Sequence, residues 1–139
     1  MSENIEEAVL LTVLNLQGKI QKRVGSALSV HGIGLSEYLV LNELYLAAMN
    51  KMRRSDLAER VGLSPSGVTR LLNPMEKIGL VEKEENPRDA RVSLVSLSAA
   101  GKQVYEEARI SFGHAAGKLL ESFDAKQLNT FSGLLKIVS

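Results

Sequence analysis

The sequence predicts a mainly helical fold of the α+β class, and three observations predict it. Between residues 51 and 79, two short helical patterns are separated by a tight turn that contains glycine. From residue 80 the periodicity changes to two extended runs around a charged turn. On both sides of this stretch, apolar residues recur at helical spacing over much longer segments. This order predicts a winged helix-turn-helix with N- and C-terminal dimerisation helices.

The first long helix is predicted over residues 5–30. Its apolar residues form a wide face, because a second row lies beside the main stripe. A helix that is apolar around more than half of its circumference needs two surfaces to cover it. The stripe consists of Val9, Val13, Leu16, Ile20, Val24 and Leu28, and the second row of Leu10, Leu11 and Leu14.

A second helix is predicted over residues 36–48. It follows the Gly32-Ile33-Gly34 break, and Ser36 is the expected N-cap. Its apolar positions are Tyr38, Leu41, Leu44 and Tyr45.

The helix-turn-helix begins with a short helix over residues 57–61. The preceding Arg54-Ser55-Asp56 supplies a capping side chain and early negative charge, and Gly62 is the expected C-terminal stop. Ser64 then serves as the N-cap of a second helix, with Pro65 at its first position, where the missing N–H costs nothing. Its inward residues are predicted to be Val68, Leu71, Leu72, Met75 and Ile78.

A β-ribbon is predicted after Gly79, with strands at residues 80–83 and 92–97 and a turn at residues 85–90. Its tip carries Arg88 and Arg91, so the ribbon suits the DNA backbone or minor groove. Asp89 can orient the Arg91 guanidinium through a charge-assisted hydrogen bond. Without that role, an Asp facing DNA phosphates would only repel them.

The last two helices are predicted from Ser98 to about Phe123 and from residue 128 onward, after a capping box at residues 124–127. One small winged domain cannot bury both apolar chain ends. We therefore expect one intertwined domain, with dimerisation helices at residues 1–35 and 98–139 and the winged helix-turn-helix at residues 36–97. The stripes contain Tyr105, Ala108, Phe112, Ala115, Leu119 and Phe123, and then Leu128, Phe131, Leu134, Leu135 and Val138.

Composition limits the alternatives. Hydrophobic residues make up 45% and charged residues 24% of the 139 positions, which is typical of a globular domain. No apolar run has the length of a membrane span, and the start MSENIEEAVLLTVL lacks the basic region of a signal peptide, so we expect a cytoplasmic protein. The absence of cysteine excludes disulfides, thiolate zinc sites and sensing by cysteine oxidation.

The net charge of the chain is small, but it is distributed unevenly along the sequence. The net charge is only +1, but residues 51–91 hold nine Lys and Arg against seven Asp and Glu, or +2. Residues 1–50 hold three against five, or −2. Non-specific affinity scales with the number of phosphates neutralised, so selective DNA binding is expected.

Several motifs resemble the MarR family of bacterial transcription regulators. They are DLA at residues 56–58, GLS at 62–64, VTRL at 68–71, EKIGLV at 76–81, PRDAR at 87–91 and LSAAG at 97–101. The resemblance implies a homodimer that binds a pseudo-palindromic operator and usually represses. It also implies that residues 64–77 are the recognition helix and that Arg91 enters the minor groove. The residues expected to contact DNA are Arg54, Ser64, Ser66, Gly67, Thr69, Arg70, Asn73, Lys77, Arg88, Asp89 and Arg91.

Pro74 departs from the family pattern, which has a polar or charged residue at this position of the recognition helix. A proline inside a helix removes the hydrogen bond to the carbonyl four residues earlier, here Arg70, at a cost of about 3 kcal/mol. We expect one helix from about Pro65 to Ile78, bent near residues 70–73.

The resemblance also implies a pocket for a small aromatic or anionic effector between the dimerisation layer and the DNA-reading unit. The candidate residues are His31, Tyr38, Tyr45 and Met49. The alternative is that the two tyrosines and Met49 are core residues, and that His31 and His114 have structural roles. Two isolated histidines predict no metal site, and no cofactor is expected.

Two other classes of function remain open at this point. An enzyme is disfavoured because the chain has no cysteine, no glycine-rich phosphate loop and no cluster of histidines with carboxylates. A winged-helix module that binds proteins instead of DNA is compatible with the fold. Such a module would present apolar anchors, whereas Ser66, Thr69 and Arg70 make the predicted surface polar.

Overall fold

The computed structural model describes residues 4–139, so residues 1–3 of the predicted dimerisation segment 1–35 lie outside the described residues. The fold is mainly helical with one small antiparallel sheet, which confirms the predicted class. In chain order the elements are α1 (Ile5–Ser29), α2 (Leu35–Leu46), the 3₁₀ turn η1 (Ala48–Asn50), β1 (Lys51–Arg53), α3 (Arg54–Val61), α4 (Pro65–Lys77), β2 (Val81–Asn86), β3 (Asp89–Leu97), α5 (Ala99–Leu119) and α6 (Ala125–Val138).

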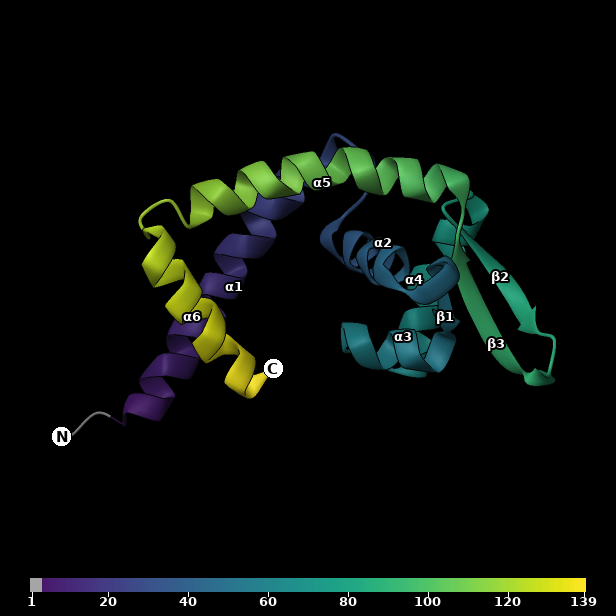
Figure 1. Ribbon diagram of the computed structural model, residues 1–139, viewed down its shortest axis with the longest axis horizontal. Helices are drawn as coiled ribbons and strands as arrows, with labels where there is room; N and C mark the ends of the chain where they lie inside the picture. The colour runs from purple at the N-terminus through teal and green to yellow at the C-terminus, as the bar shows by residue number, and fades with distance from the viewer. Residues whose placement is uncertain (1–3) are drawn as a thin grey trace.

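The elements form two groups joined by α5 (Figure 1). Helices α2, α3 and α4 and the sheet lie at one end, and the β2–β3 hairpin projects from that group. Helices α1 and α6 lie toward the other end, together with the C-terminus. Helix α5 packs against both α1 and α2, so it connects the two groups directly.

The sheet has three strands in the order β1-β3-β2, all antiparallel. The predicted two-stranded ribbon is therefore incomplete, because Lys51 to Arg53 pair with Leu94 to Ser96 on the other edge of β3. Both predicted strands are also longer than expected, and their register shifts between Glu85 and Asn86, next to the turn. A three-residue strand has too little alternation to be visible in a sequence.

The core is one continuous cluster beneath the helix-turn-helix and the sheet. Its fully buried side chains include Leu28, Leu41, Leu44, Leu57 and Leu72. Helix α5 contributes Tyr105, whose ring lies 5.3 Å from that of Tyr38 and 4.5 Å from that of Tyr45. The core therefore joins the first half of α5 to the helix-turn-helix and the sheet.

The predicted caps at three helix ends are confirmed. Gly62 ends α3 with a positive φ of 71°, and the Ser64 side chain accepts a hydrogen bond from Gly67 N at 3.1 Å. Asp124 and Gln127 form the reciprocal capping box, with bonds of 2.8 and 3.0 Å.

Two other predicted N-caps are wrong. Helix α2 starts one residue early, at Leu35, with Gly34 at the cap position and no side-chain cap bond. Helix α3 starts at Arg54 instead of after it, because β1 runs directly into the helix and Arg53 occupies the cap position. Ser55 is consequently inside the first turn.

The prediction that Ile78 faces inward is also wrong, because this side chain is 65% exposed. Helix α4 ends at Lys77, and Gly79 adopts a φ of +80°. Leu80 N then bonds to Met75 O at 2.9 Å and Gly79 N to Glu76 O at 3.1 Å, the Schellman arrangement. This turn buries Leu80 in place of Ile78.

The two chain ends leave much apolar surface uncovered. Helix α5 ends at Leu119, four residues before the predicted Phe123, and α6 contains no buried residue. Among residues 4–139 no helix combines the length and apolar character needed to cross a bilayer. Exposed apolar side chains include Val9, Leu10, Leu11, Val13, Leu14, Leu134, Leu135, Ile137 and Val138.

Helix α4 is continuous through Pro74, as predicted, and Pro74 is exposed. The bend near residues 70–73 stays a prediction. Val68, Leu72 and Met75 are buried on both sides of the proline, so the core holds the two halves of the helix in place.

Replacing Pro74 with alanine should raise the melting temperature, because alanine restores the N–H donor toward the Arg70 carbonyl and removes a penalty of up to about 3 kcal/mol. Thermal unfolding followed by circular dichroism measures this change. A mutant that melts below the parent would show that the proline stabilises the native fold.

Candidate nucleic-acid interface

Helix α4 presents a polar face away from the core. Ser64 caps it, Pro65 occupies its first turn, and Val68, Leu72 and Met75 are buried on its inner side. The expected contact residues on the other side are exposed, except for the partly exposed Gly67: they are Ser64, Ser66, Thr69, Arg70, Asn73 and Lys77. This face can reach the donor and acceptor groups of a DNA groove.

The β2–β3 hairpin places Arg88 at its tip and Arg91 at the start of β3. Asp89 holds Arg91 as predicted: Arg91 Nε donates to Asp89 Oδ1 at 3.2 Å and Nη2 to Oδ2 at 3.4 Å. The Arg91 side chain is 91% exposed. These hydrogen bonds from Arg91 lower the pKa of the Asp89 carboxyl below its ordinary value.

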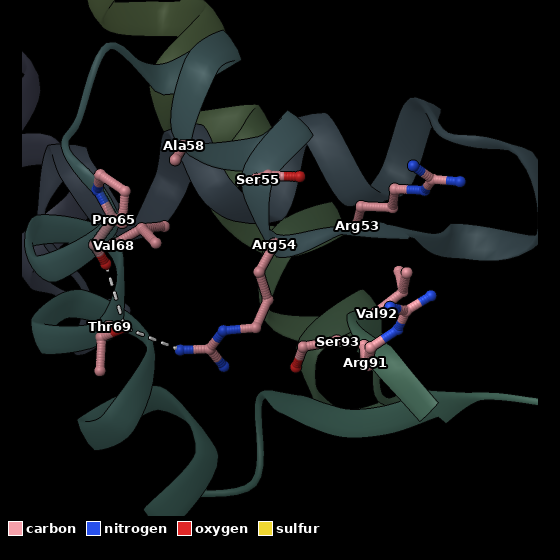
Figure 2. A pocket seen from close by; sticks show the side chains of 10 residues that line it. All are labelled: Arg53, Arg54, Ser55, Ala58, Pro65, Val68, Thr69, Arg91, Val92 and Ser93. Atoms are coloured by element: carbon pink, nitrogen blue, oxygen red, sulfur yellow. Dashed lines mark hydrogen bonds between the residues drawn. The ribbon is translucent and has the colours of Figure 1, made fainter. Parts of the chain in front are cut away.

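A groove of about 350 Å³ lies between the helix-turn-helix and the hairpin. Figure 2 shows Arg54 extending from α3 toward Thr69. On the facing side, Arg91, Val92 and Ser93 of β3 line the groove. The groove thus brings together residues from the start of α3, from α4 and from β3. Its lining is Arg53, Arg54, Ser55, Ala58, Pro65, Val68, Thr69, Arg91, Val92 and Ser93.

Arg54 is placed differently from the other candidate contacts. Its side chain is only 16% exposed, and its guanidinium forms an ion pair with Glu76 of α4 at 3.3 Å. A second nitrogen donates to Thr69 Oγ1 at 3.2 Å. Both partners belong to the protein, so this guanidinium is already engaged within the fold.

Three polar groove residues, Arg53, Ser55 and Ser93, were not among the DNA contacts predicted from the sequence. Arg53 is exposed where β1 meets α3, and it was missed because the three-residue strand was missed. Ser93 Oγ is buried with no hydrogen-bond partner among the described residues. The adjacent basic pair Arg53-Arg54 is the sequence signal that could have indicated Arg53.

The four predicted pocket residues do not share one environment. Tyr38 is buried, with its ring 4.7 Å from that of Phe112, and burial raises the pKa of its hydroxyl to about 12. Tyr45 is partly buried against the same core. His31 Nε2 lies 2.8 Å from Ser111 Oγ, which ties the loop after α1 to α5.

Met49 is 83% exposed, so the alternative that placed it in the core is wrong. It lies in the η1 turn with a φ of 58°, and the following Asn50 has a φ of 56°. Asn50 Nδ2 bonds to the carbonyls of Leu44 and Tyr45, capping the end of α2. This turn directs the Met49 side chain to the surface.

The MarR family model matches residues 31–92, which run from the loop after α1 into β3. The chain is 24% identical over 96 residues to the HTH-type transcriptional regulator PrsX of Escherichia coli, covering 69% of this chain and 58% of PrsX. It is 33% identical over 105 residues to the uncharacterized HTH-type transcriptional regulator YdgJ of Bacillus subtilis, covering 75% and 61%. The alignments thus span about three-fifths of these relatives.

Among solved structures, the chain is similar to a mutant of MarR from E. coli complexed with operator DNA. The TM-score is 0.84 at 26% identity, with 99% of each chain covered. These relatives are transcriptional regulators, which confirms the prediction of a regulator rather than an enzyme. The family match, the relatives and the winged helix-turn-helix agree: the chain belongs to the MarR family of transcriptional regulators.

Proposed function

We propose that this protein is a homodimeric, cytoplasmic repressor that binds a pseudo-palindromic DNA operator. The observation that carries the proposal is the pairing of a polar, solvent-facing α4 surface with an exposed, pre-oriented Arg91 across one basic groove. A helix face of this kind suits the major groove, and an extended arginine suits the adjacent minor groove. The similarity to a MarR structure with bound operator supports the same placement.

A mobility shift with the DNA upstream of the coding sequence tests DNA binding. The expected result is a discrete shifted band that survives excess unrelated duplex. A protein-binding winged helix predicts no such band, and the polar α4 face, which lacks large apolar anchors before Ile78, argues against that alternative.

Homodimerisation through α1, α5 and α6 follows from the apolar surface that the single chain leaves uncovered. Leucines and valines along the first half of α1 and the last half of α6 are exposed, although water contact with such residues is unfavourable. A second copy presents the same surface and can cover it through a two-fold symmetric interface.

Sedimentation equilibrium at micromolar concentration should therefore give about twice the 15.1 kDa mass of one chain. Circular dichroism under the same conditions establishes that the chain is folded. A folded species that sediments as a monomer would contradict the assignment of these helices to an interface.

The proposal includes release from DNA by a small aromatic or anionic effector. His31 and Tyr45 are the partly buried members of the predicted pocket, and the His31–Ser111 contact joins the loop before α2 to α5. A ligand at this junction would act on the connection between the dimerisation helices and the DNA-reading unit. A screen of small aromatic acids for release of bound DNA tests this part separately.

A further inference from the structure

Arg54 contacts helix α4 at two points that are seven residues apart. Its Nη2 donates to Thr69 Oγ1 at 3.2 Å, and its Nη1 pairs with Glu76 Oε1 at 3.3 Å. Residues seven apart lie on the same side of an α-helix, two turns from each other. One planar guanidinium in the first turn of α3 therefore contacts two residues of α4 that lie two turns apart. Figure 2 shows the first of these contacts, from Arg54 to Thr69.

Pro74 lies between these two contact points. Because proline has no backbone N–H, the helix lacks the hydrogen bond that residue 74 would donate to the Arg70 carbonyl. Thr69 belongs to the part of α4 before this missing bond, and Glu76 to the part after it. The Arg54 side chain thus connects the two parts across the position of the missing hydrogen bond.

The Thr69 hydroxyl, which Arg54 contacts on the N-terminal side of Pro74, is itself hydrogen-bonded to the backbone of α4. Thr69 Oγ1 lies 3.0 Å from the Pro65 carbonyl, to which it donates, so the hydroxyl is oriented to accept from Arg54. On the other side the carboxylate of Glu76 is half-buried, where a charge-assisted hydrogen bond is screened less than at the surface.

We propose that Arg54 is a positioning residue that braces the recognition helix across Pro74 and so sets the orientation of the Asn73 and Lys77 side chains. This inference rests on the proposed DNA binding. Arg54 then acts on the operator through α4 and not by contact with a phosphate. Its low exposure separates it from Arg53 and Arg91, which lie exposed at the same groove.

The test compares Arg54→Lys and Arg54→Met, each with Pro74 and with Pro74→Ala. Lysine keeps the charge but cannot hold both partners with a planar fork. Arg60→Met is the matched control, since Arg60 lies on the same helix but pairs with Glu43 of α2 at 3.8 Å. Melting temperature, affinity for an operator selected by the parent, and the salt dependence of that affinity are measured.

The brace predicts that Arg54→Lys and Arg54→Met both lower operator affinity by about tenfold, within the range of coupled neighbours. The loss should shrink to less than about threefold in the Pro74→Ala background, because alanine restores the helical bond. The Arg54 substitutions should lower the melting temperature more in the Pro74 background than in the Pro74→Ala background. Arg60→Met should cause equal, small changes in both backgrounds.

A phosphate contact predicts a different pattern. Lysine would then keep most of the affinity, and Arg54→Met would reduce the salt slope by about one. That pattern, or equal losses in both backgrounds, overturns the brace. If the parent selects no operator, the proposed DNA binding is wrong. The melting temperatures then test the role of Arg54 by themselves. Effects of the Arg54 and Pro74 substitutions on melting temperature that simply add would overturn the brace.

Discussion

Replacing Arg91 with alanine should reduce operator affinity by more than tenfold and leave the melting temperature nearly unchanged. The side chain is 91% exposed, and its hydrogen bonds in the fold go to Asp89, two residues away. An exposed pair of this kind contributes little to stability. An arginine inserted into a narrow minor groove is strongly attracted by the enhanced negative potential there.

Titration of labelled operator measures the Arg91→Ala effect, and Lys102→Ala is the control. Lys102 is an exposed cation on α5, so its removal changes the net charge equally but away from the groove. Equal affinities for the Arg91 variant and the control would contradict the assigned interface.

Arg70→Ala should produce a different defect. Arg70 lies on the exposed face of α4, where a bidentate contact to a guanine edge discriminates by about 1–3 kcal/mol. The expected result is relaxed base preference, and not the uniform loss expected for Arg91.

Gly101→Ala should destabilise the fold by at least about 2 kcal/mol, as an overpacked core position does. Gly101 is buried in the first turn of α5, where a Cβ would overlap the Leu80 carbonyl oxygen and come within 2.9 Å of Leu97 Cδ1. Ser98 fixes this junction, since its backbone N–H and hydroxyl both lie within hydrogen-bond distance of the Leu80 carbonyl. Backbone on both sides must therefore move.

Gly113→Ala in the same helix is the matched control. A Cβ at Gly113 meets no atom within 4 Å, so alanine should stabilise the helix by up to about 1 kcal/mol. Chemical denaturation of both variants measures the difference. Equal stabilities of the two variants would show that α5 does not depend on its close approach to Leu80.

The elements with strong local signals were predictable from the sequence. Ser64-Pro65, Gly62 and the Asp124 capping box each act within a few residues, so local chemistry determines their conformation. The Asp89–Arg91 pair belongs to the same class, because the two residues are two positions apart.

The features that were missed depend on residues distant in the chain. Strand β1 exists because Lys51 to Arg53 meet β3 more than 40 residues later. Ile78 has the spacing of an inward-facing residue, but α4 ends at Lys77 and the turn at Gly79 leaves the Ile78 side chain exposed. Arg54 reaches partners 15 and 22 residues away, so its bonds to Thr69 and Glu76 were not predicted from the sequence, which indicated Arg54 only as a DNA contact.

Selection of bound duplexes from a random pool tests the central proposal most directly. A homodimer that reads DNA with α4 and Arg91 should enrich one sequence with two inverted half-sites, centred about 10 bp apart. The same selection with Arg91→Ala should enrich it much more weakly. Failure of the folded parent protein to enrich any sequence, or enrichment of a single half-site without symmetry, would contradict the account.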